Sequence, residues 1–185
     1  SFEFEQGALI KNHQGYAMSL PPNSQAIRDW QVVSGQPGAH DILWVEYPNP
    51  LGIPASDGKR FVDLSGSDHR TPYGGVSQTI GLLPTLYQLK LDVGGLNPPA
   101  FPGPVSVLVT IAGTGAPPQS QGFTTTVRSG WQTFTWEFEA LGVLSGAPPG
   151  IPTELRIQGE SSQGNKNSIG VDRVSLRRLS PFLRR

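Results

Sequence analysis

Two carboxylates stand close together in the segment SDGKRFVDLSG, which covers residues 56–66: Asp57 and Asp63. Carboxylate oxygens are ligands for Ca²⁺ and acceptors for sugar hydroxyls. Strand alternation, however, places Val62 and Leu64 on the face opposite Asp63, and the Asp-Gly before them is typical of a turn. We therefore expect a short strand after a turn, with a structural role for Asp63 and ligand contact left to Asp57.

A second pair of carboxylates lies near the two ends of the chain, with Glu5 in SFEFE and Asp172 in GVDRVSL. If Val174 and Leu176 face the core, alternation puts Asp172 on the same inward side. A buried charge is costly unless it is paired, hydrogen-bonded or bound to a metal. If the first and last strands are neighbours, Glu5 and Asp172 would share a structural Ca²⁺. The alternative is that Asp172 pairs with an arginine or a backbone N–H and that Glu5 is solvated.

Several aromatic residues lie on or next to loops and are less obliged to be buried than those inside strand patterns. Planar rings stack on the apolar faces of sugars, while neighbouring polar side chains hydrogen-bond the hydroxyl groups. The candidate ligand-binding residues are Trp44, Tyr47, Asp57, His69, Arg70 and Tyr73. The alternative is that these are the spare aromatics of any β protein. Trp30, Trp131 and Trp136 sit in strong strand patterns and are assigned to the core.

Patterns of catalysis are missing from the sequence. There is no G-x-S-x-G, H-E-x-x-H or P-loop motif, and the three histidines, His13, His40 and His69, are scattered through turn-rich stretches. A glycosidase needs two carboxylates facing each other across a cleft, and nothing selects such a pair among the 14 acidic residues. We therefore expect a non-enzyme, with a glycan-active hydrolase as the remaining catalytic alternative.

Composition excludes several classes of function. The net charge is zero and no long basic run exists, which argues against a nucleic-acid partner. No run approaches the ~18 apolar residues of a membrane span. Without cysteine, disulfides, thiolate metal sites and cysteine nucleophiles are excluded. The sequence shows no initiating methionine or signal peptide, so we expect a mature or trimmed form.

The elements that must position these residues are predicted to be strands. The chain has 23 Gly and 18 Pro, and charged residues make up only 15% of it, which favours β structure with many turns. Period-2 runs recur between turn residues. They are SFEFE (1–5), WQVVSG (30–35), DILWVEY (41–47), RFVDL (60–64), GVSQTI (75–80), LYQLKLDV (86–93), PVSVLVTIA (104–112), GFTTTVR (122–128), WQTFTWEFEA (131–140), TELRIQG (153–159) and IGVDRVSLRRL (169–179). The best helical candidate is a turn at 24–30. We expect one all-β domain over residues 1–185, with ten or eleven strands in two antiparallel sheets packed as a sandwich.

An ordered set of short motifs carries a family resemblance over almost the whole chain. The motifs are F-E-x-G at 4–7, I-x-x-W-x-V-x-x-G at 27–35, the Trp at 44, S-D-G-x-x-x-V-D-L-x-G at 56–66, G-V-x-Q-T-I at 75–80, Y-x-L at 87–89, W-x-x-F at 131–134 and G-V-D-x-V-x-L at 170–176. The set resembles the galactose-binding-like domains of the cell-wall "domain of unknown function 642" group and related secreted bacterial modules similar to carbohydrate-binding modules.

The resemblance implies a jelly-roll β-sandwich that is secreted to the cell surface and binds polysaccharide or a cell-surface glycan without catalysis. Related modules often hold a structural calcium between the first and last strands, which maps onto Glu5 and Asp172. Plant members have two domains and cysteines, so this chain is closer to a bacterial type. The alternative to glycan binding is a structural subunit of an extracellular filament, matrix or surface layer that associates through its N-terminal strand.

Overall fold

The chain folds into eleven strands and no helix over the residues that its structure describes. The computed structural model describes residues 2–6, 11, 15–34, 41–50, 52–67, 71–96, 104–113, 116–126, 130–140, 150–160 and 168–179. The strands are β1 (Ala17–Leu20), β2 (Gln31–Ser34), β3 (Ile42–Glu46), β4 (Arg60–Asp63), β5 (Gly74–Leu82), β6 (Thr85–Leu96), β7 (Val105–Gly113), β8 (Gln119–Thr125), β9 (Trp131–Ala140), β10 (Ile151–Glu160) and β11 (Ser168–Arg178). Over the same residues, no helix is long and apolar enough to span a membrane.

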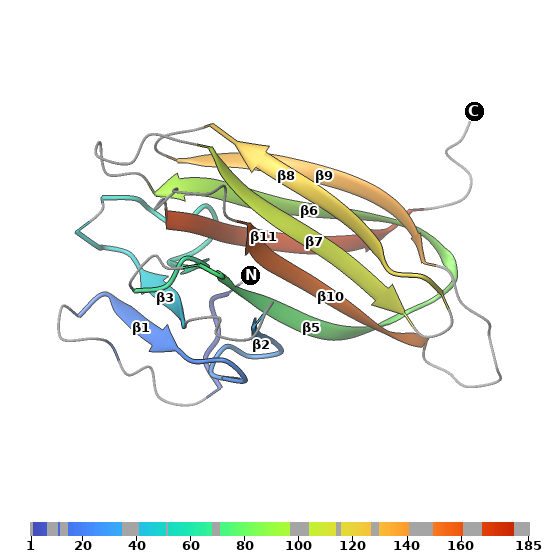
Figure 1. Cartoon of the computed structure of the whole chain (residues 1–185), viewed down its shortest axis with the longest axis horizontal. Coiled ribbons are helices and arrows are strands. Elements are labelled where there is room, and N and C mark those ends of the chain that lie inside the picture. The colour runs from blue at the N-terminus through green and yellow to red at the C-terminus, as the bar shows by residue number, and fades with distance from the viewer. Residues whose placement is uncertain are drawn as a thin grey trace.

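The strands form two antiparallel sheets, as the alternating runs predicted. The first sheet has the order β1-β3-β4-β11-β6-β9, and the second has the order β2-β5-β10-β7-β8. The long strands β5 to β11 run across the molecule in Figure 1, whereas the short strands β1, β2 and β3 gather at one end. The all-β sandwich class is confirmed. The 24–30 segment is built from turns rather than helix.

The main core lies between the two sheets and follows the predicted alternation. On β6, Tyr87, Leu89, Leu91 and Val93 are all buried and face the second sheet. The stripe of valines and isoleucine on β7 meets them from the other side, and Phe138 on β9 closes the cluster. Each side chain of this kind contributes about 1.5–3 kcal/mol when fully buried, so these stripes fix which face of each strand points inward.

A smaller core lies on the outer face of the first sheet. Phe61 and Val45 on this face are covered by Ile53 from the loop between β3 and β4. Trp131 packs edge-on against Phe61 at a centroid distance of 5.3 Å, and its indole N–H donates to the Pro54 carbonyl at 2.9 Å. Trp131 was assigned to the core because of its strand pattern, and it packs in this outer cluster rather than between the sheets.

A β-bulge in β11 reverses its alternation. The register with β6 shifts between Asp172 and Ser175, and Arg173 adopts a positive φ of 45°. As a result Val171 and Val174 both pack on the core, while Asp172 points to the opposite face. The expectation that Asp172 shares the inward face with Val174 is therefore wrong.

The N-terminal segment is not a strand of either sheet. It makes a single bridge, Glu5 to Ile27, and Phe2 is fully buried against Trp30. The neighbours of β11 are β4 and β6, so the expected pairing of the first and last strands is wrong. Because residues 2–6 are already bonded to their own chain, self-association through this segment stays a prediction that the fold does not favour.

Candidate ligand-binding site

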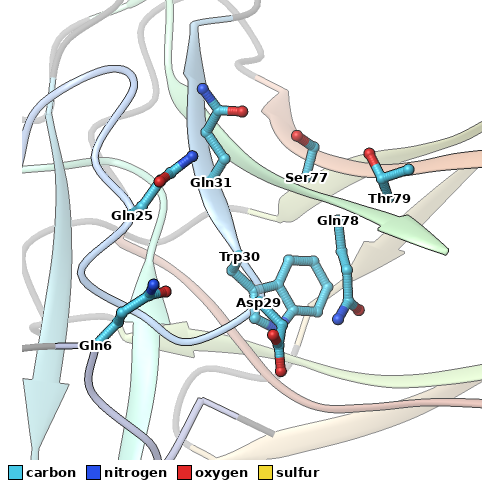
Figure 2. Close-up of a pocket in the computed structure, with 8 residues that line it drawn as sticks. All are labelled: Gln6, Gln25, Asp29, Trp30, Gln31, Ser77, Gln78 and Thr79. Atoms are coloured by element: carbon cyan, nitrogen blue, oxygen red, sulfur yellow. The ribbon is translucent and has the colours of Figure 1, made fainter.

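A polar pocket of about 350 Å³ opens at the edge of the second sheet, where β2 and β5 separate. We call it the amide pocket. Figure 2 shows Trp30 near its centre with Asp29 and Gln78 beside the ring, Gln6 and Gln25 on one side, and Ser77 and Thr79 on the other. Its lining residues are Gln6, Gln25, Asp29, Trp30, Gln31, Ser77, Gln78 and Thr79.

The pocket arises because two strands of unequal length pair at this edge. The ladder between β2 and β5 runs from Ser34 with Gly74 to Gln31 with Ser77 and ends there. β5 continues to Leu82, so its Gln78 lies past Gln31, the β2 residue at which the ladder ends. The chain that leads into β2 turns away from this edge and supplies the opposite wall of the pocket.

A tight turn presents Asp29 to the pocket. The N–H of Trp30 donates to the carbonyl of Ile27 at 3.1 Å, and Asp29 has a positive φ of 65°. The third residue of a turn of this kind is usually glycine, because a side chain is strained in the left-handed region. Asparagine and aspartate tolerate this conformation better than most residues. The turn therefore keeps a strained residue whose carboxylate faces the pocket.

The polar side chains of the amide pocket have no partners within the described part of the chain. No hydrogen bond or ion pair joins the side chains of Gln25, Asp29, Gln31 or Gln78 to another described residue. Some hydroxyls elsewhere on the second sheet are paired: Ser106 and Thr124 are joined at 2.8 Å. Primary amides donate and accept, so this pocket offers a ring of unused donors and acceptors beside an aromatic wall.

Two of the predicted ligand residues are buried. Trp44 is 2% exposed and Tyr73 is 3% exposed, so the expectation that they are freer than core aromatics is wrong. The Trp44 indole N–H donates to the Phe2 carbonyl at 2.8 Å, and the Arg60 guanidinium lies 4.9 Å from its ring centroid. Burial and the proximity of Asp63 raise the pKa of Tyr73. Neither ring presents a free face for stacking.

The other predicted ligand residues are not brought to the amide pocket. Tyr47 is 46% exposed, and Asp57 is exposed at the turn before β4. His69 and Arg70 lie outside the described residues. None of the six predicted residues lines the amide pocket, and ligand contact by Tyr47 and Asp57 stays a prediction. Asp63 is structural as expected, since its carboxylate accepts the N–H of Ser65 and of Ile169, both at 3.0 Å.

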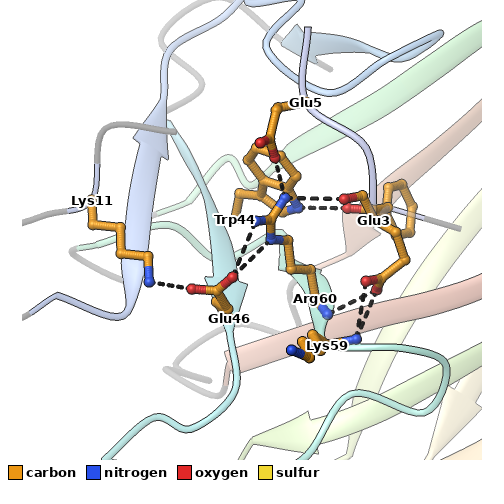
Figure 3. A network of polar contacts seen from close by, with 8 residues as sticks. Glu3, Glu5, Lys11, Trp44, Glu46, Lys59 and Arg60 are labelled. Atoms are coloured by element: carbon orange, nitrogen blue, oxygen red, sulfur yellow. Dashed lines mark hydrogen bonds and ion pairs between the residues drawn. The ribbon is translucent and has the colours of Figure 1, made fainter. Parts of the chain in front are cut away.

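Arg60 fastens the N-terminal segment to the first sheet (Figure 3). Its guanidinium contacts the carboxylates of Glu5 and Glu46, and it donates to the carbonyl of Glu3 at 3.0 Å. The Glu3 carboxylate in turn accepts the backbone N–H of Arg60 at 2.8 Å. A hydrogen bond from Lys11 and a weaker contribution from Arg60 lower the pKa of Glu46. These contacts fix the N-terminal segment, which places Gln6 in the lining of the amide pocket.

The two carboxylates predicted to share calcium have separate partners. Glu5 pairs with Arg60. Asp172 accepts the N–H of Ser56 at 2.8 Å, of Asp57 at 3.0 Å and of Arg173 at 2.7 Å. Ca²⁺ needs six to eight oxygen ligands, whereas the groups around this carboxylate are N–H donors that repel a cation. These residues do not fit calcium, and no cluster of three or more potential ligands occurs among the described residues.

Asp172 is instead a buried acceptor for the loop before β4. It is fully buried, and burial raises its pKa to about 6 even though the N–H groups of Asp57, Arg173 and Ser56 act in the opposite direction. This was the alternative reading of Asp172, in which a backbone N–H rather than a metal satisfies the charge. Binding of a structural Ca²⁺ by the chain stays a prediction.

Comparison with known proteins identifies the fold but no family. No family model and no curated protein matches the sequence, so membership of the domain-of-unknown-function 642 group stays a prediction. Among solved structures, TmCBM61 in complex with β-1,4-galactotriose has a TM-score of 0.52 at 20% identity, over 82% of this chain and 90% of that one. A CBM4 structure has a TM-score of 0.51 at 18% identity, over 85% and 92%.

A third structure agrees with these two. The C-terminal family 22 carbohydrate-binding module of Clostridium thermocellum Xyn10B has a TM-score of 0.52 at 8% identity, over 91% of this chain and 96% of that one. Each likeness covers most of both chains. The fold is therefore a jelly-roll β-sandwich of the kind found in carbohydrate-binding modules.

The residues of the amide pocket were not predicted from the sequence. Trp30 was assigned to the core, and it is largely buried, but one side of it forms the pocket wall. Gln25, Asp29 and Gln78 received no role because glutamines in loops and at strand ends carry no motif. One signal was present: an Asp just before Trp30 in a short turn-rich segment departs from both helical and strand patterns.

Proposed function

We propose that the chain is a non-catalytic carbohydrate-binding module and that the amide pocket is its saccharide site. The observation that carries this proposal is that the amide, carboxylate and hydroxyl groups lining a pocket of about 350 Å³ beside Trp30 have no partner among the described residues. Pockets of this size hold small ligands, and a few convergent polar groups give them specificity. The jelly-roll fold supports the same class of function, because its solved neighbours are carbohydrate-binding modules.

The chemistry of the lining favours a neutral sugar. Each sugar hydroxyl both donates and accepts, and each glutamine amide does the same, so Gln25, Gln31 and Gln78 match a hydroxyl-bearing ring. None of the described residues that line the amide pocket is a lysine or arginine, while Asp29 contributes negative charge. An acidic sugar in this pocket would place its carboxylate near Asp29, while the guanidinium of the neighbouring Arg28 lies outside this lining, 5.5 Å from the Phe4 ring centroid.

A hydrolytic role is disfavoured by the same lining. Glycoside hydrolysis uses two carboxylates about 5–10 Å apart, one of which donates or accepts the proton. Asp29 is the one carboxylate among the residues that line the amide pocket. Binding without cleavage is therefore the activity proposed here, with a secreted or cell-surface location, because polysaccharide ligands are found there.

Retention on immobilised polysaccharides tests the proposal. The chain is run in affinity gels that contain β-1,4-galactan, xylan, mixed-linkage β-glucan, mannan or a bacterial cell-wall glycan, and its migration is compared with that in a gel without glycan. We expect retardation by at least one neutral glycan and its loss in Gln78→Ala. The paired hydroxyl Thr124 on the outer face of β8 supplies the matched control, Thr124→Ala, which should bind normally. No retardation by any glycan would overturn the proposal.

A further inference from the structure

A second pocket of about 430 Å³ adjoins the amide pocket and is lined mainly by apolar side chains, with Arg28, Asp29 and Gln78 among them. It opens between the two sheets. Ile80 and Leu155 line it from the second sheet, and Val174 and Leu176 line it from the first. Ile80, Val174 and Leu176 are only half-buried. Apolar side chains of both sheets thus remain accessible at this edge, and we call the site the apolar pocket.

The two pockets form one continuous site. Asp29, Trp30 and Gln78 line both of them. In Figure 2, Asp29 and Gln78 stand beside the Trp30 ring. A ligand held in the amide pocket would have its next substituent within reach of the apolar pocket.

An exposed aromatic residue forms the outer wall of the apolar pocket. Phe4 is 62% exposed, which is unusual for a large hydrophobic residue of this chain. It is held in place by its neighbour, because the Phe4 carbonyl accepts the N–H of Arg28 at 2.9 Å and the Arg28 guanidinium lies 5.5 Å from the centroid of its ring. A positioned, exposed ring beside an accessible apolar floor is suited to covering an apolar group of a ligand.

We propose that the combined site recognises an amphipathic saccharide: a neutral sugar in the amide pocket that carries an alkyl, acyl or aryl substituent in the apolar pocket. This inference rests on the proposed function and names the ligand class of the same site. Polysaccharide alone would leave the half-buried apolar residues in water on binding. A substituted sugar removes them from water and gains affinity from the hydrophobic effect.

The substituent should increase affinity in a manner that depends on its length. Burial of one methylene group is worth about 0.8 kcal/mol, which corresponds to about fourfold in affinity. The gain should continue until the apolar pocket is filled and then level off. A non-specific detergent effect would instead continue to grow with chain length and would not depend on the sugar.

Calorimetric titration with the methyl, butyl, hexyl and octyl glycosides of β-D-galactose, β-D-glucose and β-D-xylose tests the inference. Each is used below its critical micelle concentration. We expect at least about tenfold tighter binding from methyl to hexyl for the preferred sugar, a smaller step from hexyl to octyl, and preserved discrimination between sugars.

Two variants test whether the gain in affinity from the alkyl substituent arises in the apolar pocket. Ile80→Trp fills the apolar pocket and Leu176→Ala enlarges it, and neither residue lines the amide pocket. We expect both to reduce the advantage of hexyl over methyl while leaving methyl-glycoside affinity unchanged. Leu108→Trp is the control, because Leu108 points outward opposite Gly122 on the far side of the second sheet. The two independent variants, each checked by thermal unfolding, keep the test valid if one of them folds poorly.

Failure of this inference is distinguishable from failure of the proposed function. Equal affinity for methyl and hexyl glycosides overturns the inference, while retention in the polysaccharide gels still supports the proposed function. A chain-length gain without discrimination between the three sugars also overturns it, since the apolar pocket would then bind the substituent without help from the sugar. Absence of glycan retention together with absence of glycoside binding overturns both.

Discussion

Asp29 is the residue in which backbone strain and ligand chemistry meet. Its φ of 65° would suit glycine, and its carboxylate lines both halves of the site. A residue other than glycine in the left-handed region costs about 1–3 kcal/mol, less for aspartate than for most. A strained residue of this kind is expected where its side chain has a function such as ligand binding. Stability and binding should therefore respond in opposite directions when that side chain is removed.

The Asp29→Gly variant tests this opposition. Glycine relieves the strain of the turn, so we expect the free energy of unfolding to rise by up to about 1 kcal/mol. Loss of the carboxylate should weaken saccharide binding at least about tenfold, as expected for a charged hydrogen bond. Urea unfolding and calorimetry measure the two quantities.

Asn23→Gly is the matched control for Asp29→Gly. Asn23 has a φ of 70° in the neighbouring turn, whose Ser24 N–H donates to the Pro21 carbonyl at 3.0 Å, and it lines neither pocket. It should change stability in the same direction with no change in binding. Equal loss of binding in both variants would show that Asp29 acts through the turn and not through its carboxylate.

The stability of the protein is predicted to depend on pH through Asp172. Its folded-state pKa is raised from 3.8 to about 6 by burial, so the folded protein binds a proton more readily than the unfolded chain. Its contribution to stability is therefore fully present below about pH 4 and is lost as the pH rises through about 6. At about 1.4 kcal/mol per pKa unit, the loss is about 2–3 kcal/mol.

Comparison with Asp172→Asn isolates this effect. The variant does not titrate at this position, whereas other carboxylates such as Glu46, whose pKa is lowered, behave alike in both proteins. The free energy of unfolding of the native chain minus that of the variant should fall between pH 4 and pH 7. A difference that stays constant or grows with pH would contradict the proposed burial of the charge.

At the scale of elements, the N-terminal segment has a role that its alternating sequence does not suggest. Glu3 accepts the N–H of Lys59 and of Arg60, and it lies against Gly58, where a Cβ atom would overlap its carboxylate. These contacts hold a segment whose Phe4 and Gln6 line the two halves of the site. Fixing the segment thus also shapes the site.

Glu3→Ala should loosen this attachment. Loss of a charged acceptor in a partly exposed position is expected to cost about 1 kcal/mol of stability. Hydrogen exchange at the amides of Lys59 and Arg60 should become faster, and saccharide affinity should fall because the walls move. Glu139→Ala, at an exposed position on β9, is the control. Unchanged exchange at both amides in Glu3→Ala would show that the segment is held by other contacts.

The strands were largely predictable because alternation reports burial directly. The runs that cover β6, β7 and β9 were predicted correctly as strands, since the alternation continues unbroken through each of them. The bulge at Arg173 was not predictable, because alternation counted through it gives the wrong face for Asp172. β1, with the sequence AMSL, was missed because its two buried residues, Ala17 and Leu20, do not alternate along the strand.

The candidate site was less predictable because it depends on where strands end. The amide pocket exists because β2 is shorter than β5, a relation between two segments over 40 residues apart that no local motif encodes. Trp44 was misjudged for the same reason. Its cover comes from Phe2 and Arg60, which are distant in sequence. Long-range contacts of this kind need the folded arrangement.

For the whole molecule, two surfaces can be compared as candidates for the proposed saccharide site. The outer face of the second sheet is broad, but no aromatic side chain points outward from its described strands, and hydroxyls of β7 and β8 there are paired, as Thr110 is with Ser120 at 2.9 Å. The edge site has unpaired polar groups and two aromatic walls. Binding at the edge suits a short ligand or a chain end rather than a long polysaccharide laid across the sheet.

Mapping of a bound saccharide by NMR tests the central claim most directly. The chain is labelled with ¹⁵N and titrated with the oligosaccharide of whichever glycan retards it in affinity gels. We predict chemical-shift changes in the side-chain amides of Gln25, Gln31 and Gln78, and in the backbone of Asp29 and Trp30. Changes confined to the outer face of β7 and β8, or to the loop at Tyr47 and Asp57, would contradict the account.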